Sequence, residues 1–173
     1  MPFTPPGRLP PRELAARLDL ILATAQALVA GLDRARMDVV PPERNRSVRE
    51  LAFHVFRLAV AFVDAADLGT FPEGWLQERA PSDLVDGPAV ARYGALVRAR
   101  LAGWFQGAAG DEYDRTVQVY YGPQSGHALL ERTTWHAGQH LRQLHELARR
   151  LDVPAEPLPA HLFRGLPMPD AVW

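Results

Sequence analysis

The sequence of 173 residues contains no cysteine. A disulfide framework, a thiolate nucleophile and a cysteine-ligated zinc or iron–sulfur site are therefore excluded. Lysine is also absent, so all 19 basic residues are arginine, and neither a Schiff-base lysine nor a P-loop lysine is present. Serine occurs only as Ser47, Ser82 and Ser125, none of them in a G-x-S-x-G turn. Serine hydrolase chemistry is therefore not predicted.

Neither sign of charge dominates the chain. The 19 basic and 20 acidic residues give a net charge of -1, whereas a nucleic-acid-binding domain usually carries a basic excess or stripe. No stretch reaches the roughly 18 uninterrupted apolar residues of a membrane-spanning helix, and the N-terminal MPFTPPGRLPP lacks the apolar core of a signal peptide. We therefore expect a cytoplasmic protein with no nucleic-acid or membrane partner.

With 47% hydrophobic residues, the chain is long enough to form one domain with its own core, and we expect residues 1–173 to be that domain. Apolar residues recur at steps of three and four, the pattern of amphipathic helices, in four segments. These segments span about 11–34, 47–68, 88–106 and 126–151. The second segment opens with an S-V-R-E capping box and is apolar nearly all round, which indicates burial on several sides. The pattern predicts an all-α four-helix bundle.

The connections between these helices are long. Residues 69–87 and 107–126 exceed simple turns, and loops of this length usually have a function or cover part of the domain. Within the second loop, the alternation T-V-Q-V-Y at 116–120 indicates a short extended segment. Residues 152–173 contain five prolines interleaved with apolar residues, so we expect a Pro-rich tail that lies along the domain.

Three of the six histidines are expected inside the bundle. His136 and His140 lie one turn apart and about 40° apart around the fourth helix, so both imidazoles can contact one ion. His54 lies on the core-facing stripe of the second helix, whereas His127 and His145 are expected at the surface. A lone interior histidine is more often a hydrogen-bonded core residue than a ligand. Three neutral imidazoles together favour a divalent metal ion.

Three protein ligands leave a coordination position open, which is typical of catalytic rather than structural metal sites. The sequence between the paired histidines, H-A-G-Q-H, lacks the glutamate of H-E-x-x-H, so a metallopeptidase is not predicted. Two alternatives stay open. One is a non-catalytic metal site with a full coordination sphere, for which Asp64 and Glu131 are the available extra ligands. The other is a set of three core histidines that binds no metal.

The segments V-R-E-L-A-F-H-V and W-H-A-G-Q-H-L-R-Q-L resemble the DinB-like superfamily, which includes the YfiT-type proteins. The resemblance covers residues 11–152 and implies a four-helix bundle, often dimeric, that holds nickel, zinc or a similar ion. It assigns the ligand role to His54, His136 and His140, and a packing or supporting role to Gln143. Gly138 departs from the pattern. It costs about 1 kcal/mol of helix stability relative to alanine and admits a close neighbour or substrate.

Characterised relatives use low-molecular-weight thiols as S-transferases or as an isomerase. The resemblance therefore implies a metal ion that lowers the pKa of a thiol cosubstrate for reaction with a small electrophile. A metal-dependent thiol S-transferase or isomerase is the leading hypothesis, and a non-catalytic metal-binding stress or interaction protein is the alternative. Tyr120, Tyr121, Arg57 and Gln139 either orient the substrate or have structural roles: loop packing, ion pairing and an exposed helix position. The apolar second helix also fits a homodimer.

Overall fold

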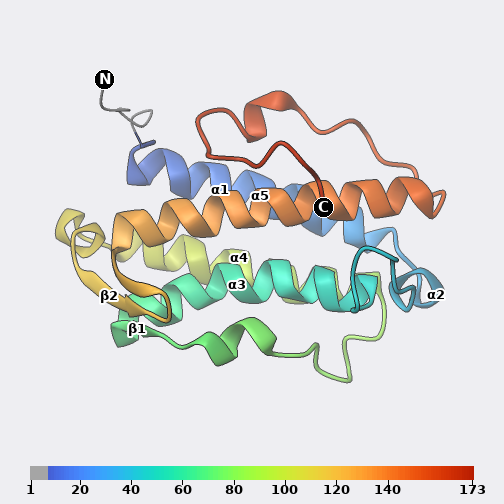
Figure 1. Ribbon diagram of the computed structural model, residues 1–173, viewed down its shortest axis with the longest axis horizontal. Helices are drawn as coiled ribbons and strands as arrows, with labels where there is room; N and C mark the ends of the chain where they lie inside the picture. Colours follow the sequence, from blue (N-terminus) through green and yellow to red (C-terminus); the bar gives the residue numbers. More distant parts are fainter. Residues whose placement is uncertain (1–7) are drawn as a thin grey trace.

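Four long helices make up most of the structure, a computed structural model that describes residues 8–173. They are α1 (Pro11–Ala30), α3 (Val48–Leu68), α4 (Gly87–Gly107) and α5 (Gly126–Arg150). Helices α1 and α3 each pack against both α4 and α5, which forms the predicted bundle (Figure 1). The expectation that the N-terminal segment is not a signal peptide concerns residues that lie mostly outside the described part of the chain. No helix within residues 8–173 has the length and apolar character to cross a membrane.

The ends of α3 follow local sequence signals. The hydroxyl of Ser47 caps the first turn and accepts the backbone N–H of Glu50 at 3.2 Å. The predicted capping box forms only in this half, because the Glu50 carboxylate accepts the N–H of Ala80 at 3.0 Å. Gly69 ends the helix with φ of 73°, a left-handed conformation that glycine adopts without a Cβ clash.

The first helix is shorter than predicted. It ends at Ala30, and Gly31 is its C-terminal cap. Asp33 then begins a separate short helix, α2 (Arg34–Met37), because its carboxylate accepts the N–H of Arg36 at 2.9 Å. The expectation of one helix over residues 11–34 is therefore wrong at its C-terminal end.

A small sheet corrects the all-α prediction. Strand β1 (Thr70–Phe71) pairs in parallel with β2 (Thr116–Val119), which pairs antiparallel with β3 (Gly122–Ser125). The expected extended segment at 116–120 thus forms β2. Because β1 comes from the first long connection and the hairpin from the second, the sheet joins both loops at one end of the bundle (Figure 1).

Helix α3 is buried by elements of its own chain. It packs against α4, α5, β1 and the 3-10 turn η1 (Glu73–Gln77). Phe56 and Phe62 are fully buried, and a Cβ at Gly94 of α4 would lie 2.7 Å from the Phe56 ring. The burial that the apolar pattern of this helix requires is therefore supplied within one chain. The homodimer stays a prediction.

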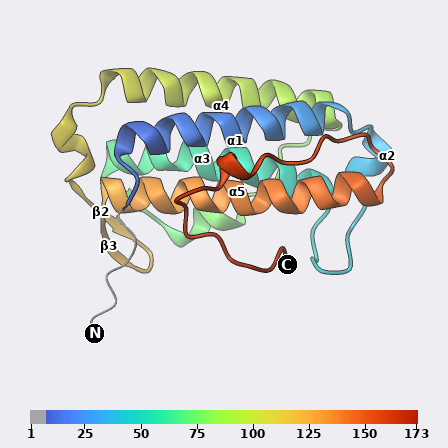
Figure 2. The same ribbon diagram turned by 90° about the horizontal axis from the view of Figure 1, so that it is seen from above.

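The C-terminal segment 152–173 returns over α1 and α5 (Figure 2). Its only regular element is the 3-10 turn η3 (Ala160–Leu162). The Arg17 side chain of α1 donates to the carbonyl oxygens of Leu162 at 3.2 Å and Arg164 at 2.6 Å. Hydrogen bonds to its backbone therefore hold this segment against the helices.

Candidate metal centre

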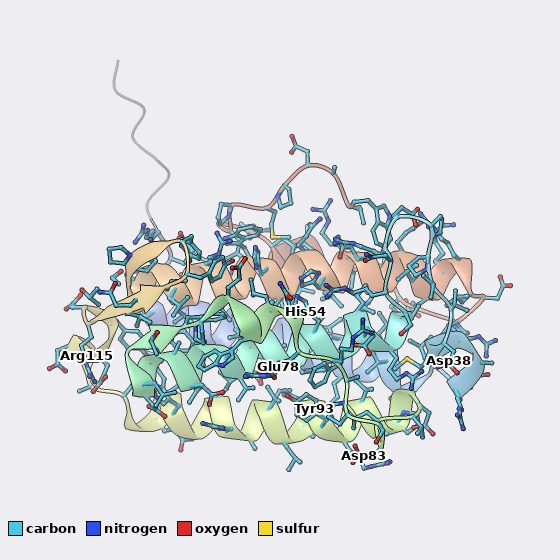
Figure 3. The ribbon with its side chains drawn as sticks, turned by 60° about the horizontal axis from the view of Figure 1, so that its bottom comes forward. Asp38, His54, Glu78, Asp83, Tyr93 and Arg115 are labelled. Atoms are coloured by element: carbon cyan, nitrogen blue, oxygen red, sulfur yellow. The ribbon has the colours of Figure 1, made fainter. Side chains whose placement is uncertain are left out.

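The three predicted histidines lie together between α3 and α5. The ring centroids of His54 and His140 are 5.1 Å apart, and those of His136 and His140 are 6.2 Å apart. Figure 3 shows His54 on the side of α3 that is nearest α5. Helical spacing on α5 and packing of α5 against α3 bring the three imidazoles to one place.

Their spacing comes close to that of a shared ligand set. Two imidazoles bound to one ion through bonds of about 2.0–2.1 Å have ring centroids about 5 Å apart. The His54–His140 pair has this separation, but the His136–His140 pair is wider. His136 instead packs edge-on against Trp135, with centroids 4.1 Å apart. Within residues 8–173, no group of three or more His, Cys, Asp or Glu residues has metal-binding geometry. A three-histidine centre therefore requires the His136 ring to turn toward the other two.

Full burial of His54 and partial burial of His136 and His140 keep the three imidazoles neutral. Desolvation is the largest cause that lowers the pKa of His54 to about 3 and the pKa values of His136 and His140 to about 4. Nearby positive charges lower these values further. A neutral imidazole keeps the nitrogen lone pair that binds a metal ion. The donor set thus fits a divalent ion in both chemistry and protonation state.

The side chain of Gln143 connects His140 to the C-terminal tail. Gln143 is 1% exposed, and its Nε2 donates to the carbonyl of Val172 at 2.8 Å. Its Oε1 therefore faces His140 Nδ1, at 3.0 Å. Because an amide oxygen only accepts, Nδ1 of His140 carries the proton and Nε2 keeps its lone pair. The tail thereby fixes the tautomer that a metal ligand at Nε2 needs.

Two residues between the paired histidines bind the same tail. A Cβ at Gly138 would meet Phe163 Cδ1 and Met168 Cε, each at 3.3 Å, so the glycine admits the tail as its close neighbour. Gln139 Nε2 donates to the carbonyls of residues 171 and 172 at 3.0 and 2.7 Å. Gln139 is therefore a tail-binding residue rather than an exposed one.

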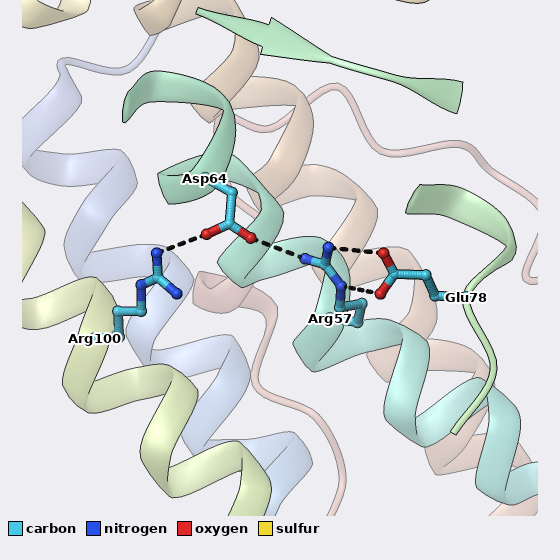
Figure 4. A network of polar contacts seen from close by, with 4 residues as sticks. All are labelled: Arg57, Asp64, Glu78 and Arg100. Carbon is cyan, nitrogen blue, oxygen red and sulfur yellow. Dashed lines mark hydrogen bonds and ion pairs between the residues drawn. The ribbon is translucent and has the colours of Figure 1, made fainter. Parts of the chain in front are cut away.

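Arg57 is an ion-paired residue. Its guanidinium pairs with both carboxylate oxygens of Glu78, including an Nη2–Oε1 distance of 3.0 Å, and with Asp64 at 3.3 Å (Figure 4). Arg100 pairs with the second oxygen of Asp64 at 2.6 Å. This network ties the segment after η1 to α3. Asp64 is occupied by two arginines, and Glu131 forms an ion pair as well, so neither is a free fourth ligand.

An apolar pocket lies beside His136. It contains about 350 Å³ of space, including space open to solvent, and its walls come from α3, α5, η1 and the sheet. Phe71 and Leu76 belong to the first long connection, and Tyr120 and Tyr121 belong to the second. The two long loops thus meet around the pocket. Each tyrosine is 40% exposed, which places both at the rim.

Arg132 also lines this pocket, and sequence reasoning missed it. It lies one helical turn before His136, so both side chains are on the same face of α5. The i, i+4 spacing is the signal that could have found it.

The two histidines expected at the surface are half-buried. His127 Nε2 lies 2.8 Å from the carbonyl oxygen of Leu9, and His145 Nε2 lies 2.8 Å from that of Glu156. The expectation was wrong because segments near both ends of the chain cover the outer face of α5. Both imidazoles hold those segments and stand apart from the candidate ligands.

A helical bundle with three neutral histidines on two facing helices, one buried and two half-buried, defines the class of protein. The chain belongs to the DinB superfamily, whose family model matches residues 17–144. The resemblance found in the sequence is thereby confirmed.

Two solved structures from Bacillus subtilis share the fold. The DinB-like protein YjoA is 16% identical, with a TM-score of 0.68 over 84% of this chain and 96% of that chain. YfiT, described as a probable metal-dependent hydrolase with an unusual four-helix bundle topology, is 14% identical, with a TM-score of 0.67 over 88% of this chain and 95% of that chain. No curated protein matches the chain.

Proposed function

We propose that the protein is a divalent-metal-dependent thiol S-transferase or isomerase that acts on a small electrophile. Nickel or zinc would be held by His54, His136 and His140, and the enzyme would work as a cytoplasmic homodimer. The observation that carries the proposal is the meeting of three neutral imidazoles, one buried and two half-buried, beside an apolar pocket. Imidazole nitrogen suits both metals.

The chain's residues have separate tasks in this proposal. A bound divalent ion supplies the Lewis acidity that lowers the pKa of a thiol. The thiol must come from a cosubstrate, because the chain has no cysteine. Gln143 keeps the Nε2 lone pair of His140 available. The apolar walls of the pocket would contact the body of the electrophile.

A metal-dependent hydrolase is the second candidate, because the structural neighbour YfiT is described as one. A carboxylate general base assists many hydrolases. The pocket wall contains no Asp or Glu within the described chain, and Asp64 and Glu78 are held by arginines. A divalent ion alone, however, lowers the pKa of bound water to about 7, so hydrolysis can proceed without a carboxylate and the activity assays decide between the two candidates.

The test is a conjugation assay with monochlorobimane as the electrophile and a panel of low-molecular-weight thiols. Untagged protein loaded with nickel or zinc should exceed the rate of thiol alone. A His54→Ala, His140→Ala double variant should lose this excess. His161→Ala is the matched control, because His161 is exposed on η3, and it should keep the parent rate.

Other results would redirect the proposal. No rate above background with any metal and thiol would refute thiol transfer. Metal-dependent hydrolysis of 4-nitrophenyl acetate in that protein would support the hydrolase instead. Bound metal without either activity would leave the non-catalytic metal-binding protein. Size-exclusion chromatography with light scattering tests the homodimer, and a monomer mass would contradict it.

A further inference from the structure

Some arginines of the chain have no acidic partner, and one of them lies beside His136. Most arginines of the chain form ion pairs or donate to backbone carbonyls, as Arg57 and Arg142 do. Within residues 8–173, Arg44, Arg46 and Arg132 are among the arginines for which the structure shows neither kind of partner. Their charges also reach the imidazoles, because the first two lower the pKa of His54 and His140, and the third lowers the pKa of His136.

Arg132 is the member of this set that lies in the wall of the apolar pocket beside His136. Its guanidinium carbon lies 4.4 Å from the ring centroid of Tyr121 and 5.8 Å from that of Trp135. These cation–π contacts position the planar group without neutralising its charge. Its N–H donors remain available, and the same wall contains no Asp or Glu within the described residues. A positioned guanidinium without a counter-ion is a binding group for an anion.

The rest of the pocket determines what the anion carries. Leu58, Phe71 and Val119 are buried apolar side chains of its walls. They match an apolar or aromatic body, whereas the guanidinium matches one planar carboxylate. A phosphate shares the fork geometry, but its greater charge and hydration fit poorly against apolar walls with a single cation.

We infer that this pocket binds a small organic carboxylate, with Arg132 as the anchor of the carboxylate and the apolar walls around its body. The inference rests on the proposed function in one respect: the pocket is the substrate site only if the adjacent histidines are the reactive centre.

Calorimetric titration with benzoate tests this inference. Benzamide is the neutral control ligand, and phenyl phosphate is the alternative anion. The protein is titrated as purified and after chelation, so that binding to a metal ion is separated from binding to Arg132. Arg132→Gln removes the guanidinium. Arg92→Gln is the matched control, because Arg92 is exposed on α4.

Benzoate should bind the parent and Arg92→Gln with equal affinity before and after chelation. Benzamide should bind the parent at least about tenfold more weakly, and benzoate should bind Arg132→Gln at least about tenfold more weakly, a change of about 1.4 kcal/mol. Arg132→Lys should lose an intermediate amount of benzoate affinity, because lysine keeps the positive charge but not the bidentate guanidinium. Circular dichroism checks that each variant is folded. The comparison of benzoate with benzamide uses only the parent protein, so it tests the inference even if a variant does not fold.

Absent benzoate binding, or equal binding by Arg132→Gln and Arg92→Gln, would overturn the inference. Tighter binding of phenyl phosphate than of benzoate would overturn the choice of carboxylate. Metal analysis of the same samples separates the two proposals. Protein that binds benzoate but no metal refutes the proposed function alone, and protein that binds metal but not benzoate refutes the carboxylate site alone.

Discussion

Replacing Gln143 with leucine tests whether the tail-held amide orients His140. The two side chains have similar size, so the variant removes hydrogen bonds more than packing. It loses the contact with His140 Nδ1 at 3.0 Å and the bond to the Val172 carbonyl at 2.8 Å. Each buried hydrogen bond contributes about 1 kcal/mol, and an unsatisfied partner costs about 1–3 kcal/mol. We expect Gln143→Leu to lower the free energy of unfolding of the metal-free protein by about 2–4 kcal/mol.

The same substitution should weaken metal binding. Without the amide acceptor, the His140 imidazole can exchange tautomers and turn away from the other two rings. Loss of such a supporting partner typically weakens metal affinity by about 10–100-fold. Urea denaturation of the metal-free protein measures the stability. Competition with a chromophoric chelator measures the affinity for zinc and nickel.

Gln139→Leu is the matched control, because it removes the tail hydrogen bonds of 3.0 and 2.7 Å and leaves the Gln143–His140 contact in place. It should lower stability but keep metal affinity within about threefold of the parent, about 0.7 kcal/mol. Parent-like metal affinity in Gln143→Leu would refute the orienting role. An equal loss of affinity in both variants would assign the effect to the tail as a whole and would also refute it.

Three further predictions concern the fold. Gly94→Ala should destabilise the protein by about 1–3 kcal/mol, because its Cβ would lie 2.7 Å from the Phe56 ring. Gly103→Ala should stabilise it by up to about 1 kcal/mol, because a Cβ at Gly103 would have no neighbour within 4 Å. Stability changes of the same sign for both variants in calorimetry would contradict this. Glu78→Gln should weaken the Arg57 pair and speed hydrogen exchange in η1, while changing stability by less than about 1 kcal/mol; unchanged exchange would count against it. The metal-free protein should lose stability as pH falls from about 6.5 toward 4. The imidazoles of the unfolded chain take up protons in this range, whereas those of the folded protein, with pKa values of about 3 to 4, do not. A dependence of stability on pH that is unchanged when the three histidines are replaced with glutamine would refute this.

Sequence periodicity located the long helices because their packing repeats every three to four residues. The capping position of Ser47 and the left-handed position of Gly69 were also local signals. The sheet was harder to predict, because β1 has two residues and pairs with a strand from a different loop. A strand this short has no alternation of its own, so its existence depends on a distant partner.

The candidate site likewise has a part that the sequence predicts and a part that it does not. Helical spacing and the core-facing stripe brought His54, His136 and His140 together. The contacts of Gln139 and Gln143 depend on where the C-terminal tail lies across α5, and no local pattern determines that path. The turn of the His136 ring toward Trp135 is likewise a result of packing.

The most direct test of the central claim is elemental analysis of untagged protein, with His136→Ala, His140→Ala as the site variant and His161→Ala as the control. The account predicts about one divalent ion per chain in the parent and the control and little in the site variant. Equal metal content in the parent and the site variant, or none in either after dialysis against zinc and nickel, would contradict it.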